Sequence, residues 1–344
     1  MTRAPLRVAV LGAGTVGREV VRELLASRFA ELQLVGVAVR DIGKAQADGI
    51  PEALLTDAPA HLVAGDSDVI VELMGGEEPA RTLIGAALGA GKPVVTANKL
   101  VLARHGAELE RVARERDSPL RFEASVMGGT PVLRLLAEDL AGTRLTALRG
   151  IVNGTTNHIL TEMAASGMSY ADALDAAQAA GYAEADPAAD VEGGDAADKL
   201  VILARMAFGA WLDRAAVPRA EPGRAAGITG VTAEDLRAAA AGGEAIRLIA
   251  STERAPDGAI VAAVLPSKVP LESAFGRTLG VRNRLEIEAD PLGTVAVEGP
   301  GAGGAATANA VLSDLVAIAR GKGSTWGALP PASTADQRAP WDAE

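Results

Sequence analysis

The chain contains no cysteine among its 344 residues. Disulfide bonds, thiolate nucleophiles and cysteine-ligated zinc are therefore excluded. Aromatic residues make up only 3% of the sequence while hydrophobic residues make up 49%, so the core must consist mainly of Ala, Val, Leu and Ile. The three histidines, His61, His105 and His158, are scattered, and no two of them have the spacing of metal ligands.

Positive charge is also scarce, because the formal net charge is -11. Nucleic acids and acidic membrane surfaces attract basic proteins, so neither is expected as a partner. The first apolar run, Leu6 to Leu11, enters a glycine-rich turn directly and is too short for a signal peptide or a membrane span. We expect a cytoplasmic enzyme, and at roughly 150 residues per domain the length predicts about two domains.

The N-terminal part of the chain alternates between two hydrophobic patterns. Helices are predicted between short apolar runs, notably at 15–27, 79–90 and about 101–116. Strands are predicted at Leu6–Leu11, Leu34–Val39, Val69–Leu73, Pro93–Thr96 and Leu120–Ala124. This alternation predicts a doubly wound parallel sheet of the Rossmann-like type.

A glycine motif, Gly12-Ala-Gly14-Thr-Val-Gly17, follows the first predicted strand and opens the first predicted helix. In this position the first glycine makes the tight turn, the second lets the backbone approach a pyrophosphate, and the third lets helix pack on strand. A plain glycine-rich turn is the alternative, but the flanking pattern favours a dinucleotide site at the helix N-terminus.

The end of the second predicted strand bears on the choice of cofactor. An acidic residue there usually binds the ribose 2′-hydroxyl of NAD. This strand ends Val39-Arg40-Asp41, and a guanidinium is well suited to a 2′-phosphate. We therefore expect NADP as the cofactor, with Arg40 binding its 2′-phosphate. Asp41 leaves NAD open as an alternative cofactor.

The pattern changes after about residue 131. Helices are predicted near 157–166, 170–180 and 195–209, a strand at 145–152, and a meander of strands at 245–251, 259–265, 284–289 and 293–298. We expect a nucleotide-binding domain at 1–130, completed by a C-terminal helix at about 305–320. An α+β substrate-binding and dimerisation domain is expected at 131–304, and a loose tail at 321–344.

An acidic segment without Lys or Arg runs from Ala171 to Asp198. Such runs are usually solvated loops. Here it ends in Asp195-x-x-x-Lys199, a spacing that places both side chains on one helix face. Carboxylates of this kind can hold a substrate ammonium beside a lysine that acts as an acid or a charge clamp. Divalent-metal binding is the other functional interpretation.

Several motifs together resemble those of the homoserine dehydrogenase family, over residues 6 to about 320. The most specific are Asn153-Gly-Thr-Thr-Asn157 and Gly181-Tyr-Ala-Glu-Ala-Asp-Pro187; others are Glu72-Leu-Met-Gly-Gly76, Thr96-Ala-Asn-Lys99 and Glu123-Ala-Ser-Val126. The resemblance implies NAD(P)H-dependent interconversion of L-aspartate 4-semialdehyde and L-homoserine, in threonine and methionine biosynthesis. It also implies a homodimer.

Site residues follow from the same resemblance, motif by motif. Lys199, Lys99 and Asp195 match the catalytic group. Gly181, Glu184, Asp190 and Asp195 match the substrate pocket. Gly12, Gly14, Thr15, Val16, Gly17, Arg40, Lys99 and Gly303 match cofactor contacts. Glu123, Val126, Gly128 and Thr130 match a loop that holds a monovalent cation, usually sodium, although Met127 stands where the family commonly has glycine.

The chemistry that this resemblance implies fits the lysines. When a hydride adds to an aldehyde carbon, the oxygen becomes negative, and a nearby ammonium can stabilise and protonate it. Lys99 and Lys199 both qualify by type, and the sequence does not separate their roles.

Three rival functions share part of this sequence pattern. Aspartate-semialdehyde dehydrogenase needs a nucleophilic cysteine and is excluded. The others are another two-domain oxidoreductase and a redox-inactive dinucleotide-binding regulator, which has no need of Asp195 and Lys199. No further folded segment is expected after the tail, so we expect no feedback inhibition by threonine.

Overall fold

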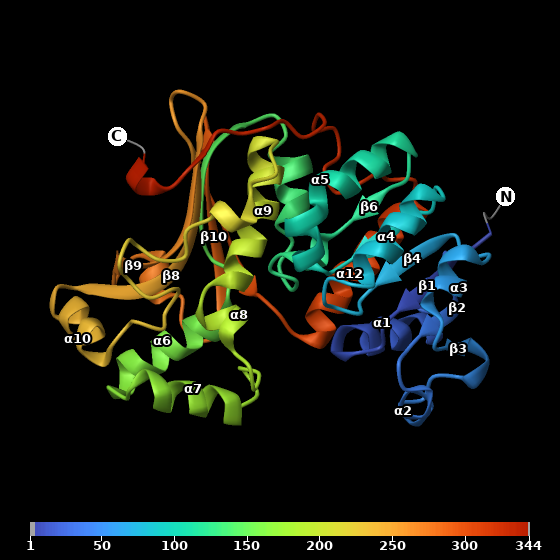
Figure 1. The fold of residues 1–344 in the computed structure, drawn as a ribbon, viewed down its shortest axis with the longest axis horizontal. Coiled ribbons are helices and arrows are strands. Elements are labelled where there is room, and N and C mark those ends of the chain that lie inside the picture. The colour runs from blue at the N-terminus through green and yellow to red at the C-terminus, as the bar shows by residue number, and fades with distance from the viewer. Residues whose placement is uncertain (1–3, 343–344) are drawn as a thin grey trace. The chain divides into compact units, whose positions relative to one another are not determined.

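The computed structural model describes residues 4–342, and these form two compact units. One unit comprises residues up to Asp139 together with Ala302–Pro331, and the other comprises Leu140–Gly301 together with the residues from Ala332 onward. Residues 1–3 of the expected first domain and residues 343–344 of the expected tail lie outside the described part. Figure 1 shows the chain coloured from blue at the N-terminus to red at the C-terminus.

The first unit is built on a six-stranded parallel sheet with the strand order β3-β2-β1-β4-β5-β6. Its strands are β1 (Leu6–Leu11), β2 (Leu32–Ala38), β3 (Leu55–Thr56), β4 (Val69–Glu72), β5 (Val94–Thr96) and β6 (Leu120–Arg121). Its helices are α1 (Thr15–Leu25), α2 (Ile42–Ala47), α3 (Pro59–Ala64), α4 (Ala80–Gly89), α5 (Lys99–Glu115) and α12 (Gly304–Ala319). The predicted doubly wound, Rossmann-like sheet is confirmed.

The core of this unit draws on a distant part of the sequence. Val8 and Val10 of β1 are fully buried, and Val311 and Leu315 of α12 pack in the same apolar cluster. The helix α12 lies against α1, as Figure 1 shows by the orange ribbon among the blue elements. Burying the apolar face of α12 therefore binds the C-terminal part of the chain into the N-terminal unit.

The second unit contains a sheet with the strand order β11-β10-β7-β8-β9-β12. Its strands are β7 (Arg144–Ile151), β8 (Glu244–Arg254), β9 (Ile260–Pro270), β10 (Arg282–Asp290), β11 (Gly293–Pro300) and β12 (Gln337–Arg338). Its helices are α6 (Gly154–Ser166), α7 (Tyr170–Ala179), α8 (Ala188–Val191), α9 (Gly194–Phe208), α10 (Ala233–Ala241) and α11 (Ala274–Arg277). The mixed sheet with its helices confirms the expected α+β class.

Three details differ from the sequence-based prediction. The later strands do not form one meander, because β7 pairs with both β8 and β10 and so separates two hairpins. The strand predicted at Leu120–Ala124 ends at Arg121, because the Glu123 N–H donates to the Asp314 carboxylate (2.9 Å) instead of a neighbouring strand. The described part of the expected loose tail is partly fixed, because Trp326 is buried and β12 pairs with β9.

Candidate active site

The glycine motif lies between β1 and α1, at the carboxyl edge of the parallel sheet. A Cβ on Gly12 would approach the Leu73 carbonyl oxygen to 2.7 Å, and a Cβ on Gly17 would approach the Gly12 oxygen to 2.0 Å. Both glycines are therefore required by the packing of the turn itself. Gly14 differs, because a Cβ there would meet no atom within 4 Å. An exposed glycine that opens a helix leaves room for a phosphate at the N–H groups of α1.

The N-terminus of a second helix lies beside this turn. Gly303 precedes α12 and has a φ of +125°, a conformation that favours glycine. A Cβ on its neighbour Gly304 would come within 3.1 Å of the Thr15 carbonyl oxygen. Thr15 and Gly303 are thus brought together by the fold, and Val16 packs its side chain against the core of the unit. The backbone N–H groups at these positions are suited to donate hydrogen bonds to the pyrophosphate of a dinucleotide.

Arg40 and Asp41 follow the end of β2 and have different environments. The Asp41 carboxylate caps α2 by accepting the N–H of Lys44 at 2.9 Å. Arg40 is exposed, and within residues 4–342 its guanidinium has no hydrogen-bond or ion-pair partner. The Asp41 carboxylate is therefore already used as a helix cap, whereas the Arg40 guanidinium is available to bind a ligand.

A buried carboxylate joins the two loops that follow β4 and β5. Glu72 has no exposed surface; its Oε1 accepts the N–H of Met74 (2.8 Å) and its Oε2 accepts the Thr96 hydroxyl (2.7 Å). The Thr96 oxygen in turn accepts the N–H of Asn98 at 3.0 Å. Burial raises the pKa of Glu72 above its ordinary value, against the effect of these hydrogen bonds.

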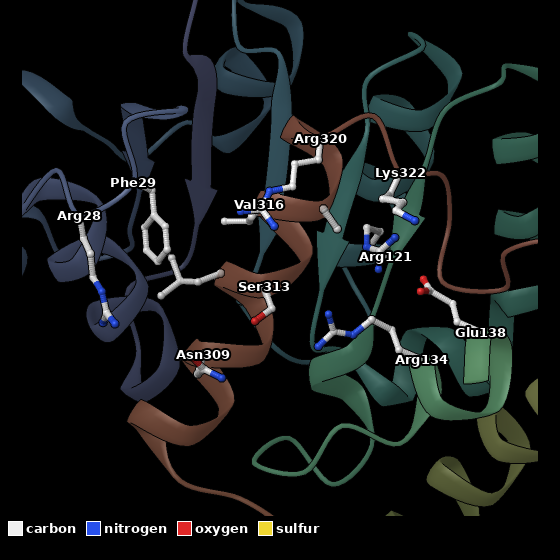
Figure 2. A pocket seen from close by; sticks show the side chains of 12 residues that line it. Arg28, Phe29, Arg121, Arg134, Glu138, Asn309, Ser313, Val316, Arg320 and Lys322 are labelled. Carbon is white, nitrogen blue, oxygen red and sulfur yellow. The ribbon is translucent and has the colours of Figure 1, made fainter. Parts of the chain in front are cut away.

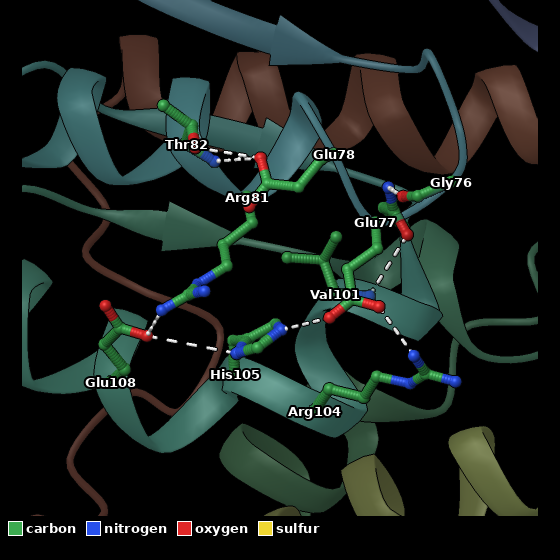
Figure 3. Close-up of polar contacts among 10 residues, drawn as sticks. Gly76, Glu77, Glu78, Arg81, Thr82, Val101, Arg104, His105 and Glu108 are labelled. Carbon is green, nitrogen blue, oxygen red and sulfur yellow. Dashed lines mark hydrogen bonds and ion pairs between the residues drawn. The ribbon is translucent and has the colours of Figure 1, made fainter.

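Lys99 is positioned by this arrangement. Asn98 caps α5 by accepting the N–H of Val101 (3.2 Å) and donates its Nδ2 to the Gly76 carbonyl oxygen (2.8 Å). Glu77 then pairs with Arg104 (2.6 Å) and His105 (2.7 Å) on α5, as Figure 3 shows. Lys99 is the first residue of α5, where a cation is disfavoured by the helix dipole by about 0.3–1 kcal/mol.

Lys199 lies in a buried polar cluster in the second unit. Its Nζ contacts the Asp195 carboxylate (2.8 Å), as the spacing on α9 predicts, and the Val152 carbonyl oxygen (2.6 Å). The exposed fractions of Lys199 and Asp195 are 8% and 7%. An ammonium has three N–H groups, and among the described residues only these two acceptors contact it. One N–H is therefore left for a ligand.

Asn153 connects the acidic segment to this lysine, and the sequence-based prediction missed it. Its Nδ2 donates to Asp190 (2.6 Å) and to Asp195 (2.8 Å). Its Oδ1 accepts the N–H of Thr156 (2.8 Å) as the N-cap of α6, which fixes the orientation of the amide. The Asn153-Gly-Thr-Thr motif was the available signal, because an asparagine followed by a helix is a typical cap.

Gly181 and Glu184 belong to the segment after α7, which contacts the start of α6 where the Thr155 hydroxyl donates to the Tyr182 carbonyl oxygen (2.9 Å). Gly181 has a φ of +76° at the end of α7, and no atom lies near the position of its missing side chain. The Glu184 side chain is exposed, while its backbone oxygen accepts a hydrogen bond from Gln178 (2.8 Å). A carboxylate in this setting stays hydrated, so its pairing with a ligand is weaker than that of a buried one.

The loop from Glu123 to Thr130 is buried. The Glu123 carboxylate accepts the N–H groups of Val132 (2.8 Å), Leu133 (3.0 Å) and Arg134 (2.9 Å), so it is already satisfied. Burial, followed by the nearby Asp314 charge, raises the pKa of Glu123. Met127, at the position where glycine is expected, has a φ of +48°, which costs a side-chain-bearing residue about 1–2 kcal/mol.

The donor set of this loop limits how it can hold an ion. No group of three or more acidic or histidine side chains suited to a metal occurs in the part of the chain that the structure describes. A cation at Glu123, Val126, Gly128 and Thr130 would therefore be held by backbone carbonyl and hydroxyl oxygens. Such neutral oxygen donors fit a hard monovalent cation.

Comparison with known proteins decides the family. The homoserine dehydrogenase profile matches residues 131–316, and the profile of the homoserine dehydrogenase NAD-binding domain matches residues 12–123. The chain belongs to the homoserine dehydrogenase family. The enzyme of Corynebacterium glutamicum is 43% identical over 92% of this chain and 72% of its own length, and that of Mycobacterium bovis is 46% identical over 92% and 73%.

Solved structures agree with the family assignment. A homoserine dehydrogenase from Thiobacillus denitrificans is 37% identical and superimposes with a TM-score of 0.89, over 97% of this chain and 79% of its own. A hyperthermophilic archaeal homoserine dehydrogenase in complex with NADPH is 28% identical, with a TM-score of 0.75 over 91% and 97% of the two chains. The chain is thus an NAD(P)-dependent oxidoreductase that interconverts L-aspartate 4-semialdehyde and L-homoserine, as the motifs imply. Within residues 4–342, no helix has the length and apolar composition needed to cross a membrane.

Proposed function

We propose that Lys199 exchanges the proton with the substrate oxygen during the reaction. The observation that carries this proposal is the buried ammonium of Lys199, which is held by Asp195 and Val152 with one N–H left over. A nicotinamide cofactor held at the glycine turn of the first unit would supply or accept the hydride at the aldehyde carbon. As the C–H bond forms, the carbonyl oxygen gains an electron pair and takes a proton from Lys199, which becomes a neutral amine; homoserine oxidation reverses each transfer.

Lys99 has a different role in this proposal. It would act toward the bound cofactor as a fixed positive charge, because the hydrogen bonds from Glu72 through Thr96 and Asn98 hold the start of α5 in place. Its unfavourable position at a helix N-terminus supports a functional requirement for the charge there. Asp195 orients Lys199, and Asn153 acts as a positioning residue for both carboxylates.

For the cofactor, we propose a preference for NADP over NAD, with Arg40 reading the 2′-phosphate. The support is the unpaired guanidinium of Arg40 beside a capping Asp41, and the NADPH complex of the archaeal relative. The pyrophosphate would be held by backbone donors at Gly12, Gly14, Thr15, Val16 and Gly17, with Gly303 beside them. The first unit therefore serves as the nucleotide-binding domain and the second as the substrate and dimerisation domain.

For the substrate, we propose that Glu184 and Asp190 meet its ammonium group and that Gly181 supplies a backbone contact. Asp190 is the stronger candidate, because its half-buried carboxylate accepts a hydrogen bond from the buried Asn153 amide (2.6 Å). Glu184 is exposed, so we expect a smaller contribution from it than burial would give.

Further proposals concern the cation and the assembly. The loop at Glu123, Val126, Gly128 and Thr130 would hold a monovalent cation, sodium in the first instance.

The protein would act as a homodimer in the cytoplasm. The edge strand β11 pairs only with β10 among the described strands, and such an unprotected edge favours pairing with another chain.

The decisive experiment is a steady-state assay of homoserine oxidation with NADP and with NAD. Turnover with NADP at lower KM than with NAD supports the proposal. Turnover of another amino alcohol in preference to homoserine would contradict the proposed substrate site. Adding sodium or potassium chloride to the dialysed enzyme tests the cation, and light scattering after size-exclusion chromatography tests the dimer.

A further inference from the structure

A cavity on the first unit has a lining that the reaction does not explain. Its volume is about 350 Å³, and its lining comes from α12, the segment after α1, the segment around Arg134, and the residues after α12. Figure 2 shows these side chains arranged around α12. Small-molecule sites usually have volumes of about 300–1,000 Å³, so the cavity can accept a small ligand.

The lining is basic in a chain whose net charge is -11. Five basic side chains and one acidic side chain line it: Arg28, Arg121, Arg134, Arg320, Lys322 and Glu138. Arg121 is neutralised by Asp314 at 2.8 Å, and Arg28 pairs with Glu23 at 3.1 Å. The side chains of Arg320 and Lys322 have no ion-pair or hydrogen-bond partner within residues 4–342. Two cationic side chains without a partner therefore remain among these residues, and Arg134 forms only a long ion pair with Glu123 (3.6 Å).

Arg134 contributes an incompletely satisfied donor. Its Nε is buried and makes no hydrogen bond, because the nearest Glu123 oxygen is 3.6 Å away and is already bonded to backbone N–H groups. Figure 2 shows its guanidinium pointing toward the α12 side of the cavity, where Ser313 lies. The terminal nitrogens of Arg134 are thus presented to the cavity with no acceptor described for them.

Helix capping alone does not account for this arrangement. Arg320 and Lys322 follow α12, where cations are favoured by the helix dipole. Arg134, however, comes from a separate segment and gains nothing from the end of α12. Its Nε forms a long ion pair with Glu123 (3.6 Å), while its terminal nitrogens converge with Arg320 and Lys322 on a cavity whose lining holds one carboxylate, Glu138. Such a convergence of cations is what an anion-binding site requires.

One wall of the cavity is apolar, apart from the Arg28 guanidinium, which lies 5.7 Å from the centre of the Phe29 ring. Phe29, Leu312 and Val316 line it, and Phe29 also packs against the core of the unit. A purely inorganic ion would leave this wall in contact with water. We propose that the cavity binds a small organic phosphate, with its phosphate group at Arg134, Arg320 and Lys322 and its apolar part against Phe29. This proposal does not depend on the proposed reaction.

The test is isothermal titration calorimetry with phenyl phosphate and with inorganic phosphate, on enzyme saturated with NADP so that the dinucleotide site is filled. The pocket variant is Arg320→Ala/Lys322→Ala. The control is Arg111→Ala/Arg116→Ala, which removes two exposed positive charges of the same unit outside the cavity. Loss of two charge-assisted contacts should weaken phenyl phosphate binding at least about tenfold in the pocket variant and less than about twofold in the control.

A second variant, Ser313→Asp, places a negative charge in the cavity from the partly exposed face of α12 and should abolish binding without altering thermal unfolding. Tighter binding of phenyl phosphate than of inorganic phosphate supports the apolar wall. No binding to the unaltered protein, equal losses in pocket and control variants, or equal affinity for the two probes would overturn the proposal. Because homoserine turnover is not measured, these outcomes are distinguishable from a failure of the proposed function.

Discussion

The carboxylate of Glu72 and the hydroxyl of Thr96 form a hydrogen bond of 2.7 Å inside the first unit, although they end different strands of the sheet. This hydrogen bond links the start of the loop after β4 to the start of the loop after β5. The second loop leads through Asn98 to Lys99 at the start of α5. A fully buried residue can therefore affect the position of Lys99, which we propose acts as a fixed positive charge.

We predict that Glu72→Gln lowers kcat by about tenfold or more, because small displacements of catalytic groups are costly. An amide NH₂ that faces the Met74 N–H cannot accept that hydrogen bond, and one that faces Thr96 turns the hydroxyl into an acceptor, so one of the two hydrogen bonds is either lost or reversed. Steady-state kinetics should show the fall in kcat with little change in KM for NADP. Glu110→Gln, another buried carboxylate of the same unit, is the control and should leave kcat unchanged. Equal kcat values for Glu72→Gln and the unaltered enzyme would contradict the positioning role.

Stability should depend on pH through Glu72. Burial raises its pKa above the ordinary value of 4.5, so the folded state binds more protons than the unfolded state between the two pKa values. The free energy of unfolding must then fall as pH rises from 4.5 through the raised pKa of Glu72. Urea unfolding at both ends of the range should show a smaller decrease in Glu72→Gln. A decrease of the same size in both proteins would show that Glu72 does not carry the effect.

Removal of the Lys199 ammonium should abolish turnover. Lys199→Ala is expected to lower kcat by about 10²–10⁴-fold, the usual contribution of a positioned proton donor. Affinity for NADP, measured by fluorescence titration, should stay within about twofold because Lys199 belongs to the second unit. Lys99→Ala should also be severe. If only Lys99→Ala reduces kcat, the proton transfer must be assigned to Lys99.

Asn153→Ala should reduce kcat/KM for homoserine more than its effect on folding explains. Loss of the cap costs about 0.5–2 kcal/mol of stability, and Ser169→Ala, the N-cap of α7, provides the matched loss. Only Asn153 also donates to Asp190 and Asp195. Kinetics at a temperature where both variants are folded separate the two effects. A similar kcat/KM for Asn153→Ala and Ser169→Ala would show that Asn153 acts only as a helix cap.

Arg40→Ala should raise KM for NADP but not for NAD. A charge-assisted hydrogen bond contributes about 1.5–3 kcal/mol, which corresponds to about tenfold to a hundredfold in affinity. The expected result is a selective increase with NADP, measured at saturating homoserine. A parallel increase with both cofactors would mean that Arg40 does not read the 2′-phosphate.

Local sequence was sufficient for the features that depend on near neighbours. The alternation of apolar runs predicted the parallel sheet, the glycine spacing predicted the turn between β1 and α1, and the Asp195–Lys199 spacing predicted their contact on α9. These features follow from backbone geometry and from periods of two and 3.6 residues, which any stretch of sequence carries in itself.

Only the tertiary structure decided the contacts between distant segments. Asn153 meets Asp195 because α6 and α9 are packed in one unit, and Glu72 meets Thr96 because β4 and β5 are neighbours in the sheet. The return of α12 to the first unit places Asp314 against Arg121 and forms one side of the basic cavity. Sequence periodicity shows which faces must be buried but not which partner buries them, because that choice depends on the packing of the whole chain.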